Sequence, residues 1–393
     1  MRFLILNTDY PEFLRWLYGQ NPGLGEKSYD EQLRVRMESL FGVADFYSSN
    51  LSKLGHEAWD VHINNEFMQR RWAEEHGLIS KQPLSVTGLT KRAFAQTARQ
   101  AAATPLRHLK PILRPVFHAF NGKNPLSYEI LSAQIQYYKP DVVLNQAMDG
   151  RIGHFFKEMK KYIRILVGQI ASPLPQGDDY GCYDLLISSL PNFVDYFRQI
   201  GIVAELHLFG FEPGILSRIV PGEREITVSF VGSLSVDHTA RIQWLEHLCR
   251  AVDIEVWGHG VERLPKDSWI RKRYRGSAWG IEMYRVLSHS KIAVNHHIGV
   301  AGSFANNMRL FEATGLGCLL MTDWKVNLND LFRIDTEVLC FRRPEECAET
   351  IRYYLGNPQK RESIAQSGQK RALRDHTYAR RMDELAGMVQ KYI

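Results

Sequence analysis

The chain has 393 residues, more than a single hydrophobic core usually serves, so two domains are expected. Its 45% hydrophobic and 23% charged residues are typical of a globular protein and exclude a disordered, collagen-like or repeat protein. A net charge of +6 favours anionic ligands such as nucleotide diphosphates and is weak support for nucleic acid, which is not expected as a partner. No apolar run approaches the length of a membrane span, and the first residues predict a β-strand, not a signal peptide.

The cysteines are scattered, with no C-x-x-C pair and no His at zinc-finger spacing. They are Cys182, Cys249, Cys318, Cys340 and Cys347. This pattern argues against disulfides or structural zinc and favours a reducing cytoplasm. Each cysteine is expected to pack as a small buried hydrophobe.

Short β-rich runs alternate with longer amphipathic stretches in the first half, which indicates parallel sheets covered by helices. The expected strands are residues 3–7, 57–62, 141–145, 163–169, 185–188 and 203–208, and the expected helices are 31–54, 128–138, 152–160 and 192–199. The connection over about 65–122 is too long for a plain loop and is interpreted as a helical insertion.

A Gly- and Pro-rich stretch between residues 210 and 223 is the expected domain joint. Beyond it we expect strands at 227–231, 253–257, 291–295, 318–322 and 337–341, and helices at 240–251, 281–288, 306–315, 344–355 and from 358 onward. The fold class is therefore α/β, with two Rossmann-like domains, 1–210 and 211–375, that face a cleft. The last residues, 376–393, are expected to form a helix that packs back on the N-terminal domain.

Glycine-rich turns follow the first two strands of the second half. Gly232 and Ser233 come directly after the first strand, and Trp257 and Gly258 end the second. Glycine lets backbone N–H groups approach a phosphate, serine adds a donor, and a tryptophan can stack on a base. An ordinary βα turn and a core tryptophan are the alternatives.

A strand-to-helix junction near residue 306 carries polar residues in an otherwise apolar segment. Asn306 and Asn307 precede the helix, whose N-terminal amides favour anions. Arg309 can bind a diphosphate through its guanidinium fork. Glu312 interrupts an apolar stripe, and a ribose diol would supply the donors that a buried carboxylate needs. Pairing of Glu312 with a nearby cation is the alternative.

The order of these motifs resembles the C-terminal domain of group-1 GT-B glycosyltransferases, especially the branch with spore-maturation-type enzymes. The resemblance is carried by Arg-Leu-Phe-Glu-Ala at 309–313 with Gly317, by Thr322-Asp323, and by the segments 329–332 and 376–382. It spans about residues 226–393, whereas the first 210 residues match only in the order of strands and helices. It implies the GT-B fold, with Glu312 on the nucleotide ribose and Gly232, Asn306, Asn307 and Arg309 on the diphosphate.

The implied activity is transfer of a sugar from a nucleotide-diphosphate sugar to a hydroxyl acceptor, which is a glycan, a lipid-linked compound or a small molecule. Such enzymes stabilise the leaving diphosphate with amides and cations and need no metal or other cofactor, and Asp-x-Asp occurs nowhere in the chain. The common pattern has a further Glu eight positions before Glu312, where this chain has Phe304. This departure leaves the donor sugar and the expected retaining outcome open.

Other activities remain open on the same fold. A nucleotide-sugar epimerase or hydrolase would bind the donor without an acceptor, and an inactive protein would only bind it. An NAD-dependent dehydrogenase is disfavoured, because no G-x-G-x-x-G opens a helix.

Four residues at strand ends are candidates for the chemistry. Asp9 and Asp149 follow strands of the first half, and either can act as a general base if the reaction inverts, with turn capping as the alternative. His296 and His297 follow the strand at 291–295. Adjacent residues point to opposite faces, so one of them can reach the donor while both cannot hold one ion. A structural role for both is the alternative.

The predicted insertion carries cations interleaved with apolar residues. They are Lys91, Arg92, Arg99, Arg107, Lys110 and Arg114. Such a face can rest on an anionic leaflet, which would suit a lipid-linked acceptor and a location at the inner face of the membrane. A plain helical surface is the alternative.

Overall fold

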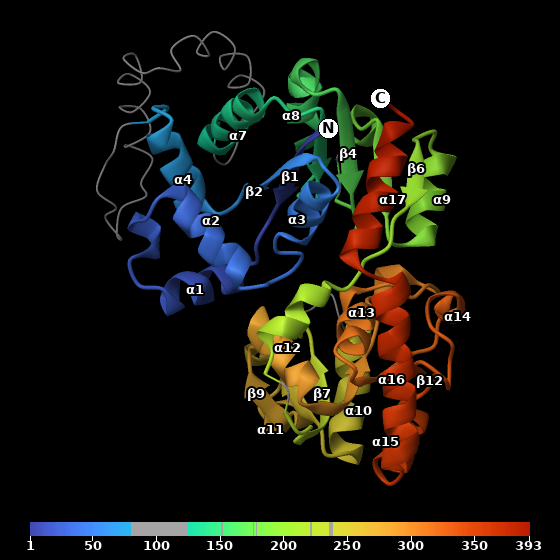
Figure 1. The fold of residues 1–393 in the computed structure, drawn as a ribbon. Coiled ribbons are helices and arrows are strands. Elements are labelled where there is room, and N and C mark those ends of the chain that lie inside the picture. The colour runs from blue at the N-terminus through green and yellow to red at the C-terminus, as the bar shows by residue number, and fades with distance from the viewer. Residues whose placement is uncertain (80–124, 151, 176, 178, 221, 236–238) are drawn as a thin grey trace.

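A computed structural model describes residues 1–79, 125–150, 152–175, 177, 179–220, 222–235 and 239–393. It contains two six-stranded parallel sheets, each covered by helices, which form an upper and a lower domain in Figure 1. The α/β prediction with two Rossmann-like domains is confirmed.

The N-terminal sheet has the order β2-β1-β3-β4-β5-β6. Its strands are β1 (Arg2–Asn7), β2 (Glu57–His62), β3 (Val142–Asn145), β4 (Ile165–Gln169), β5 (Leu185–Ser188) and β6 (Ala204–Leu206). Its helices are α1 (Pro11–Gln20), α2 (Tyr29–Glu38), α3 (Phe46–Lys53), α4 (Glu66–Glu75), α7 (Pro125–Tyr138), α8 (Ile152–Met159) and α9 (Pro191–Gln199). Phe3 and Ile5 belong to one core cluster, and Leu4 and Leu6 belong to another. Because β1 is buried on both faces, its residues 3–6 are all apolar and do not alternate with polar ones.

The C-terminal sheet has the order β12-β11-β10-β7-β8-β9. Its strands are β7 (Ile226–Val231), β8 (Glu255–Trp257), β9 (Tyr274–Gly276), β10 (Ser290–Asn295), β11 (Leu319–Asp323) and β12 (Leu339–Phe341). Its helices are α10 (Thr239–Ala251), α11 (Trp269–Arg273), α12 (Ile281–Ser288), α13 (Met308–Gly315), α14 (Leu328–Leu331), α15 (Pro344–Leu355) and α16 (Pro358–Asp375). A last helix, α17 (Tyr378–Gln390), follows after a break at His376.

Most predicted elements are present, but four regions differ. The single helix predicted at 31–54 is two helices, α2 and α3, because Leu40, Gly42 and Ala44 have positive φ angles of 59°, 61° and 41°. Helix α1, which begins with Pro11 in its first turn, was not predicted, nor were β9 and α11. The helix predicted from 358 onward is interrupted where α17 begins.

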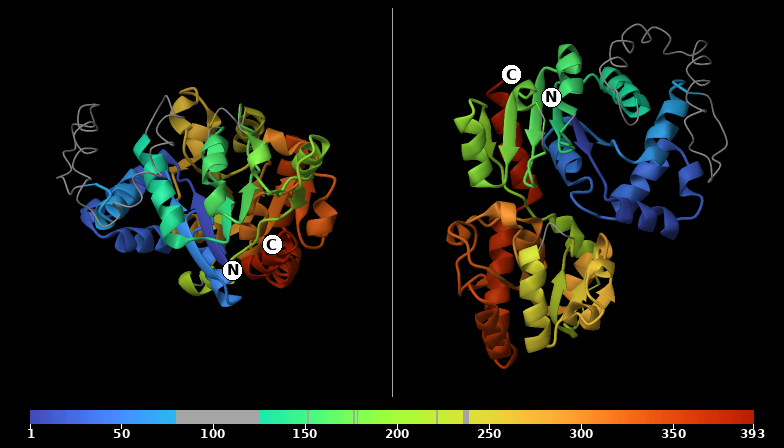
Figure 2. Two further views of the ribbon diagram at one scale, coloured as in Figure 1. Left: turned by 90° about the horizontal axis from the view of Figure 1, so that it is seen from above. Right: turned by 180° about the vertical axis from the view of Figure 1, so that it is seen from behind.

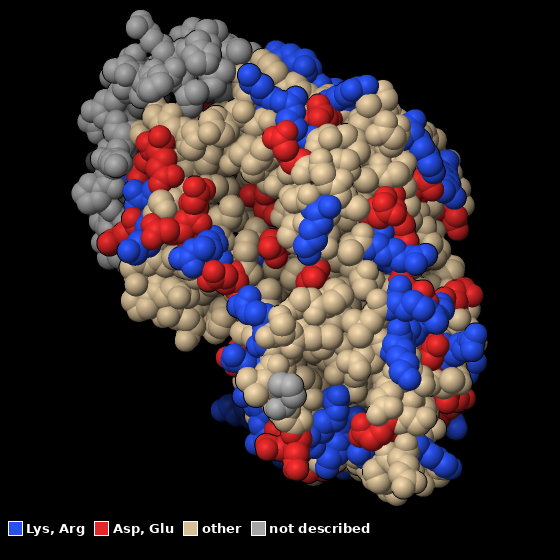
Figure 3. Space-filling model, viewed as in Figure 1, with Lys and Arg blue, Asp and Glu red and all other residues tan. Residues whose placement is uncertain are grey.

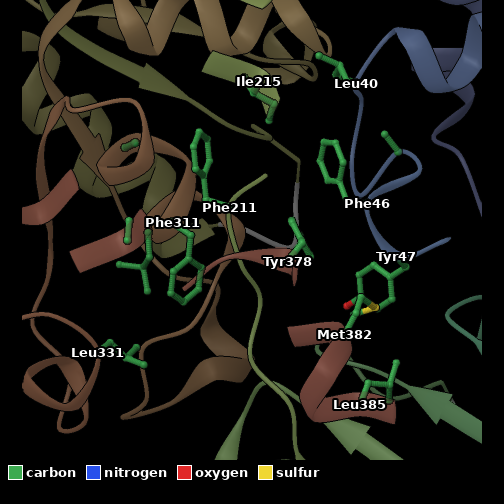
Figure 4. Close-up of a cluster of buried hydrophobic side chains, with 14 of the residues drawn as sticks. Leu40, Phe46, Tyr47, Phe211, Ile215, Phe311, Leu331, Tyr378, Met382 and Leu385 are labelled. Atoms are coloured by element: carbon green, nitrogen blue, oxygen red, sulfur yellow. The ribbon is translucent and has the colours of Figure 1, made fainter. Parts of the chain in front are cut away.

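Two chain segments cross between the domains side by side. The backbone N–H of Phe211 donates to His376 O at 2.7 Å, and the N–H of Tyr378 donates to Phe211 O at 3.0 Å. A Cβ on Gly315 would collide with the ring of Phe211, so α13 packs directly on the joint. Tyr378 continues the apolar cluster into the N-terminal domain, where its ring lies 5.2 Å from that of Phe46 (Figure 4). Helix α17 therefore packs against α3, and Figure 1 and the right-hand view of Figure 2 show it, in red, among the elements of the upper, N-terminal domain.

The cation cluster of the predicted insertion lies in residues 80–124, outside the described residues. No helix in the described part of the chain is long and apolar enough to cross a membrane. No disulfide joins the cysteines of the described residues, and all of these cysteines but Cys340 are buried. Basic and acidic side chains are interspersed on the face shown in Figure 3, as on an ordinary solvated surface.

Candidate active site

A cavity of about 540 Å³ lies between the two domains. In both sheets the strand order reverses next to the first strand, and ligands of such folds bind at the carboxyl ends of the strands there. Thr8 and Gln146 line the cavity after β1 and β3, and Gly232 and His297 line it after β7 and β10. The two reversal points thus face each other, across a volume that fits a small-molecule site.

The predicted glycine-rich turns line this cavity. Gly232, Ser233 and Gly258 all contribute to its surface. A Cβ on Gly258 would collide with the carbonyl oxygen of Gly232, so the two turns touch backbone to backbone. The N–H of Gly232 donates to Trp257 O at 3.0 Å, and this N–H is therefore already engaged in the sheet.

Trp257 does not line the cavity. Its half-buried indole packs against the core cluster that joins the domains, which favours the alternative of a core tryptophan over stacking on a base. Trp279, in the loop between β9 and α12, lines the cavity instead, stacked on His259 with ring centroids 5.4 Å apart. Sequence reasoning missed it, because an isolated tryptophan in a loop gives no periodic signal.

The N-terminus of α13 opens on the cavity. Asn307 caps this helix, since its Oδ1 accepts from the N–H of Leu310 at 3.2 Å, and its Nδ2 donates to Asn295 Oδ1 at 2.9 Å. Asn306 reaches across the domain interface, where its Nδ2 donates to Ser189 O at 2.7 Å. Both asparagines line the cavity, as the sequence predicted for a ligand-facing helix start.

Arg309 and Glu312 form a partly buried ion pair on the cavity wall. Arg309 Nη1 lies 2.6 Å from Glu312 Oε2, and the hydroxyl of Tyr284 donates to Glu312 Oε1 at 3.5 Å. Burial raises the pKa of Glu312, although Arg309 opposes this shift. The alternative of pairing with a cation is therefore realised here. It does not exclude a ligand, because a carboxylate has about four acceptor positions.

A second guanidinium, that of Arg241, lines the same wall and was not predicted. Its Nε and Nη2 donate to His296 O at 3.0 and 2.7 Å. Burial lowers its pKa to about 10, so the side chain is charged at neutral pH. Arg241 is the third residue of α10, where a cation opposes the helix dipole. This unfavourable position of a cation is the signal in the sequence that could have indicated a functional role for Arg241.

The two histidines face opposite sides, as strand geometry predicted. His297 lines the cavity, and its Nδ1 lies 2.6 Å from Oδ1 of Asp323. His296 lies outside the cavity and packs against Trp244, with ring centroids 5.4 Å apart. Of the two candidates, only His297 is placed to meet a ligand there.

Asp9 does not line the cavity. Its Oδ1 lies 2.7 Å from Arg36 Nη2, and its Oδ2 lies 2.9 Å from His62 Nδ1, all three side chains being buried. Burial alone would raise the pKa of Asp9, but His62 and Arg36 hold it well below its ordinary value. This carboxylate is weakly basic and closed off from the cavity, so the structure does not support the prediction of a general base.

Asp149 is also not in the cavity lining. Its exposed side chain accepts from the N–H of Ile152 at 3.1 Å, at the start of α8. The capping alternative therefore holds, and the prediction of a general base at this position is not supported.

Aromatic rings and a close backbone contact join the two walls at one end. Phe41 of the N-terminal domain meets Trp279 edge to face at 5.1 Å. The N–H of Ile281 donates to Ser39 O at 2.9 Å, and a Cβ on Gly280 would collide with that same oxygen. Gly280 has a φ angle of 53°, so glycine is required there for both reasons.

The described residues include no group of three or more His, Cys, Asp or Glu side chains that could hold a metal ion. The charged side chains that line the cavity are instead the guanidiniums of Arg241 and Arg309 and the carboxylate of Glu312. The wall is thus suited to an anionic ligand.

Two Rossmann-like domains with a ligand cavity between their carboxyl edges define the GT-B class of fold. Residues 241–387 match the family described as glycosyl transferase-like, and no curated protein matches the chain. Among solved structures, HepE from Anabaena is similar over 100% of both chains, with 11% identity and a TM-score of 0.56. A glycosyltransferase from Rickettsia africae is similar over 100% of this chain and 98% of that one, with 10% identity and a TM-score of 0.55. Sucrose-phosphate synthase from Thermosynechococcus elongatus is similar over 100% and 99%, with 12% identity and a TM-score of 0.55.

The family match lies in the C-terminal domain, and the structural similarity extends the GT-B fold to the whole chain. The C-terminal domain is thus similar to glycosyl transferase-like proteins, and the chain as a whole has the GT-B fold. Its placement in the spore-maturation branch stays a prediction.

Proposed function

We propose that the chain transfers a sugar from a nucleotide-diphosphate sugar to a hydroxyl acceptor, without a metal ion. The observation that carries this proposal is the convergence of Arg241, Arg309 and the N-terminus of α13 on one interdomain cavity. Cations and helix amides together bind phosphate oxygens well. The fold neighbour HepE has been crystallised with UDP and with UDP-glucose, which supports a ligand of this class.

In this proposal Arg309 and the α13 amides bind the diphosphate, and Glu312 accepts hydrogen bonds from the ribose. The bond between the anomeric carbon and the phosphate oxygen breaks, and its electron pair stays on the diphosphate. The acceptor oxygen bonds to the anomeric carbon, and its proton passes to the leaving phosphate if configuration is retained. Arg241 and Arg309 stabilise the charge that develops on the leaving group.

The test is binding and turnover in EDTA. UDP, GDP, ADP and their sugar derivatives are screened by thermal shift, and donor consumption is followed with sugar, glycan and lipid-linked acceptors. We expect at least one nucleoside diphosphate to stabilise the protein equally in EDTA and in Mg²⁺. Stabilisation by none of them would contradict the proposal. Isomerisation of the donor without an acceptor would identify an epimerase, and binding without turnover an inactive binding protein.

Two further measurements sharpen the proposal. Glu312→Ala should weaken nucleoside diphosphate binding, whereas Glu282→Ala, at an exposed position of α12, should not. Full affinity in Glu312→Ala would disprove the ribose assignment even if the activity is present. The anomeric configuration of the product, read by NMR, tests the expected retention.

A further inference from the structure

One ring nitrogen on the cavity wall has no hydrogen-bond partner among the described residues. It is Nε2 of His297, a side chain that is only 3% exposed. The other ring nitrogen, Nδ1, lies 2.6 Å from Oδ1 of Asp323, which also accepts from the backbone N–H of His297 at 3.0 Å. Asp323 thus fixes the orientation of the ring through Nδ1, while Nε2 on the opposite side of the ring has no partner among the described residues.

Asp323 fixes where the ring proton lies. Lys325 Nζ is 3.3 Å from its Oδ2. Burial would raise the pKa of Asp323, but His297 and nearby cations hold it well below its ordinary value. The carboxylate is therefore an acceptor, and the proton of a neutral His297 must lie on Nδ1. This leaves Nε2 with a lone pair, as a hydrogen-bond acceptor.

A second unsatisfied acceptor lies on the same wall. Oδ1 of Asn306 is buried and has no partner in the described part of the chain, while its Nδ2 donates to Ser189 O. Asn306 is 4% exposed and, like His297, lines the cavity. Buried acceptors without donors are costly, so two of them on one cavity wall indicate a ligand that donates.

Both acceptors lie beside the proposed diphosphate site. Asn306 directly precedes the helix cap Asn307, and Asn307 is bonded to Asn295, two residues before His297. Lone pairs repel phosphate oxygens, whereas sugar hydroxyls donate to them. A sugar joined to a diphosphate at the α13 N-terminus would lie beside these two acceptors, Nε2 of His297 and Oδ1 of Asn306.

We propose that His297 and Asn306 bind hydroxyl groups of the sugar being transferred, and that Asp323 is a positioning residue for His297. This inference rests on the proposed function and changes the role predicted for Asn306, from the diphosphate to the sugar. His297 and Asn306 would also supply contacts to the sugar in a chain that has Phe304 where the related pattern has Glu. Phe304 does not line the cavity.

The experiment separates the sugar from the nucleotide. Calorimetry gives dissociation constants for UDP and UDP-glucose, GDP and GDP-mannose, and ADP and ADP-glucose, and the pair that binds wild type best is kept. The ratio of the two constants measures what the sugar contributes. We expect His297→Ala and Asn306→Ala each to reduce this ratio about 3- to 10-fold, with affinity for the bare nucleoside diphosphate unchanged.

Three more variants make the test specific. His297→Gln, whose side-chain oxygen reaches about as far as Nε2, should retain part of the ratio. Asp323→Asn, which no longer fixes the ring proton, should reduce the ratio less than His297→Ala does. His296→Ala is the matched control, because this neighbouring ring lies outside the cavity, and the ratio should stay at its wild-type value.

Two results would overturn the assignment. An unchanged ratio of the two dissociation constants in His297→Ala would show that His297 does not contact the sugar. If turnover were lost as well, His297 would act on the acceptor. Equal weakening of nucleoside diphosphate and nucleotide sugar would make it a phosphate or structural residue. If wild type bound none of the six compounds, the proposed function itself would fall, and this inference with it.

Discussion

The two walls of the interdomain cavity differ in charge. The C-terminal wall presents Arg241, Arg309 and Glu312, whereas no charged side chain lines the N-terminal wall among the described residues. The N-terminal domain does have charges nearby, but Asp9 and Arg36 are paired behind that wall. Under the proposed function, charged groups would therefore bind the donor at the C-terminal wall, and an acceptor would be selected by shape and by neutral polar groups such as Gln146.

The sharpest test of the N-terminal side is Asp9→Asn. Loss of this carboxylate leaves Arg36 buried without its counter-charge, so we expect the free energy of unfolding to fall by about 3–5 kcal/mol. Because the folded pKa of Asp9 is lowered, its stabilisation is present at neutral pH and is lost as pH falls below about 4. Chemical denaturation at neutral and acid pH should therefore show a shallower acid dependence in the variant.

The exposed Asp30→Asn serves as the control for charge removal. Nucleoside diphosphate affinity should be unchanged in folded Asp9→Asn protein. Normal stability with abolished turnover would restore Asp9 as a catalytic base and end the contrast between the walls.

On the donor side the corresponding variant is Arg309→Ala. It would remove the charge-assisted contact proposed for the diphosphate, so we expect nucleoside diphosphate affinity to fall on the order of 10- to 100-fold by calorimetry. Arg285→Ala, at an exposed position of α12, is the matched control and should bind as wild type does. Unchanged affinity in Arg309→Ala would mean that the diphosphate lies elsewhere.

The contrast between the walls could be predicted from the sequence only for the C-terminal wall. Arg309 and Glu312 stand three residues apart at a helix start, a local pattern that fixes both their shared face and their position near a strand end. The opposite orientation of His296 and His297 follows in the same way from strand alternation. Patterns of this kind depend only on residues that are close in sequence, so they can be interpreted without knowledge of the tertiary structure.

The N-terminal wall depends on contacts between distant residues, which no local pattern encodes. Asp9 is closed off by Arg36 and His62, 27 and 53 residues further along the chain. The break between α2 and α3 requires Leu40 and Ala44 at positive φ, which neither residue favours on its own. Tertiary packing decides the position of Asp9 and the break between the helices. The sequence therefore predicted that Asp9 follows the end of a strand, but not the direction in which its side chain points.

The smallest expected effect belongs to Asp149→Ala, and it bears on the same contrast. Loss of the bond from the Ile152 N–H should lower stability by about 1 kcal/mol, which a thermal unfolding scan can detect. Turnover and nucleotide affinity should stay at wild-type values, because Asp149 does not line the cavity. If turnover were lost while stability and nucleotide affinity held, a carboxylate of the N-terminal domain would be acting on the acceptor. The N-terminal wall would then be uncharged only in this arrangement of the two domains. Closure of the cleft would have to bring Asp149 to the reacting atoms.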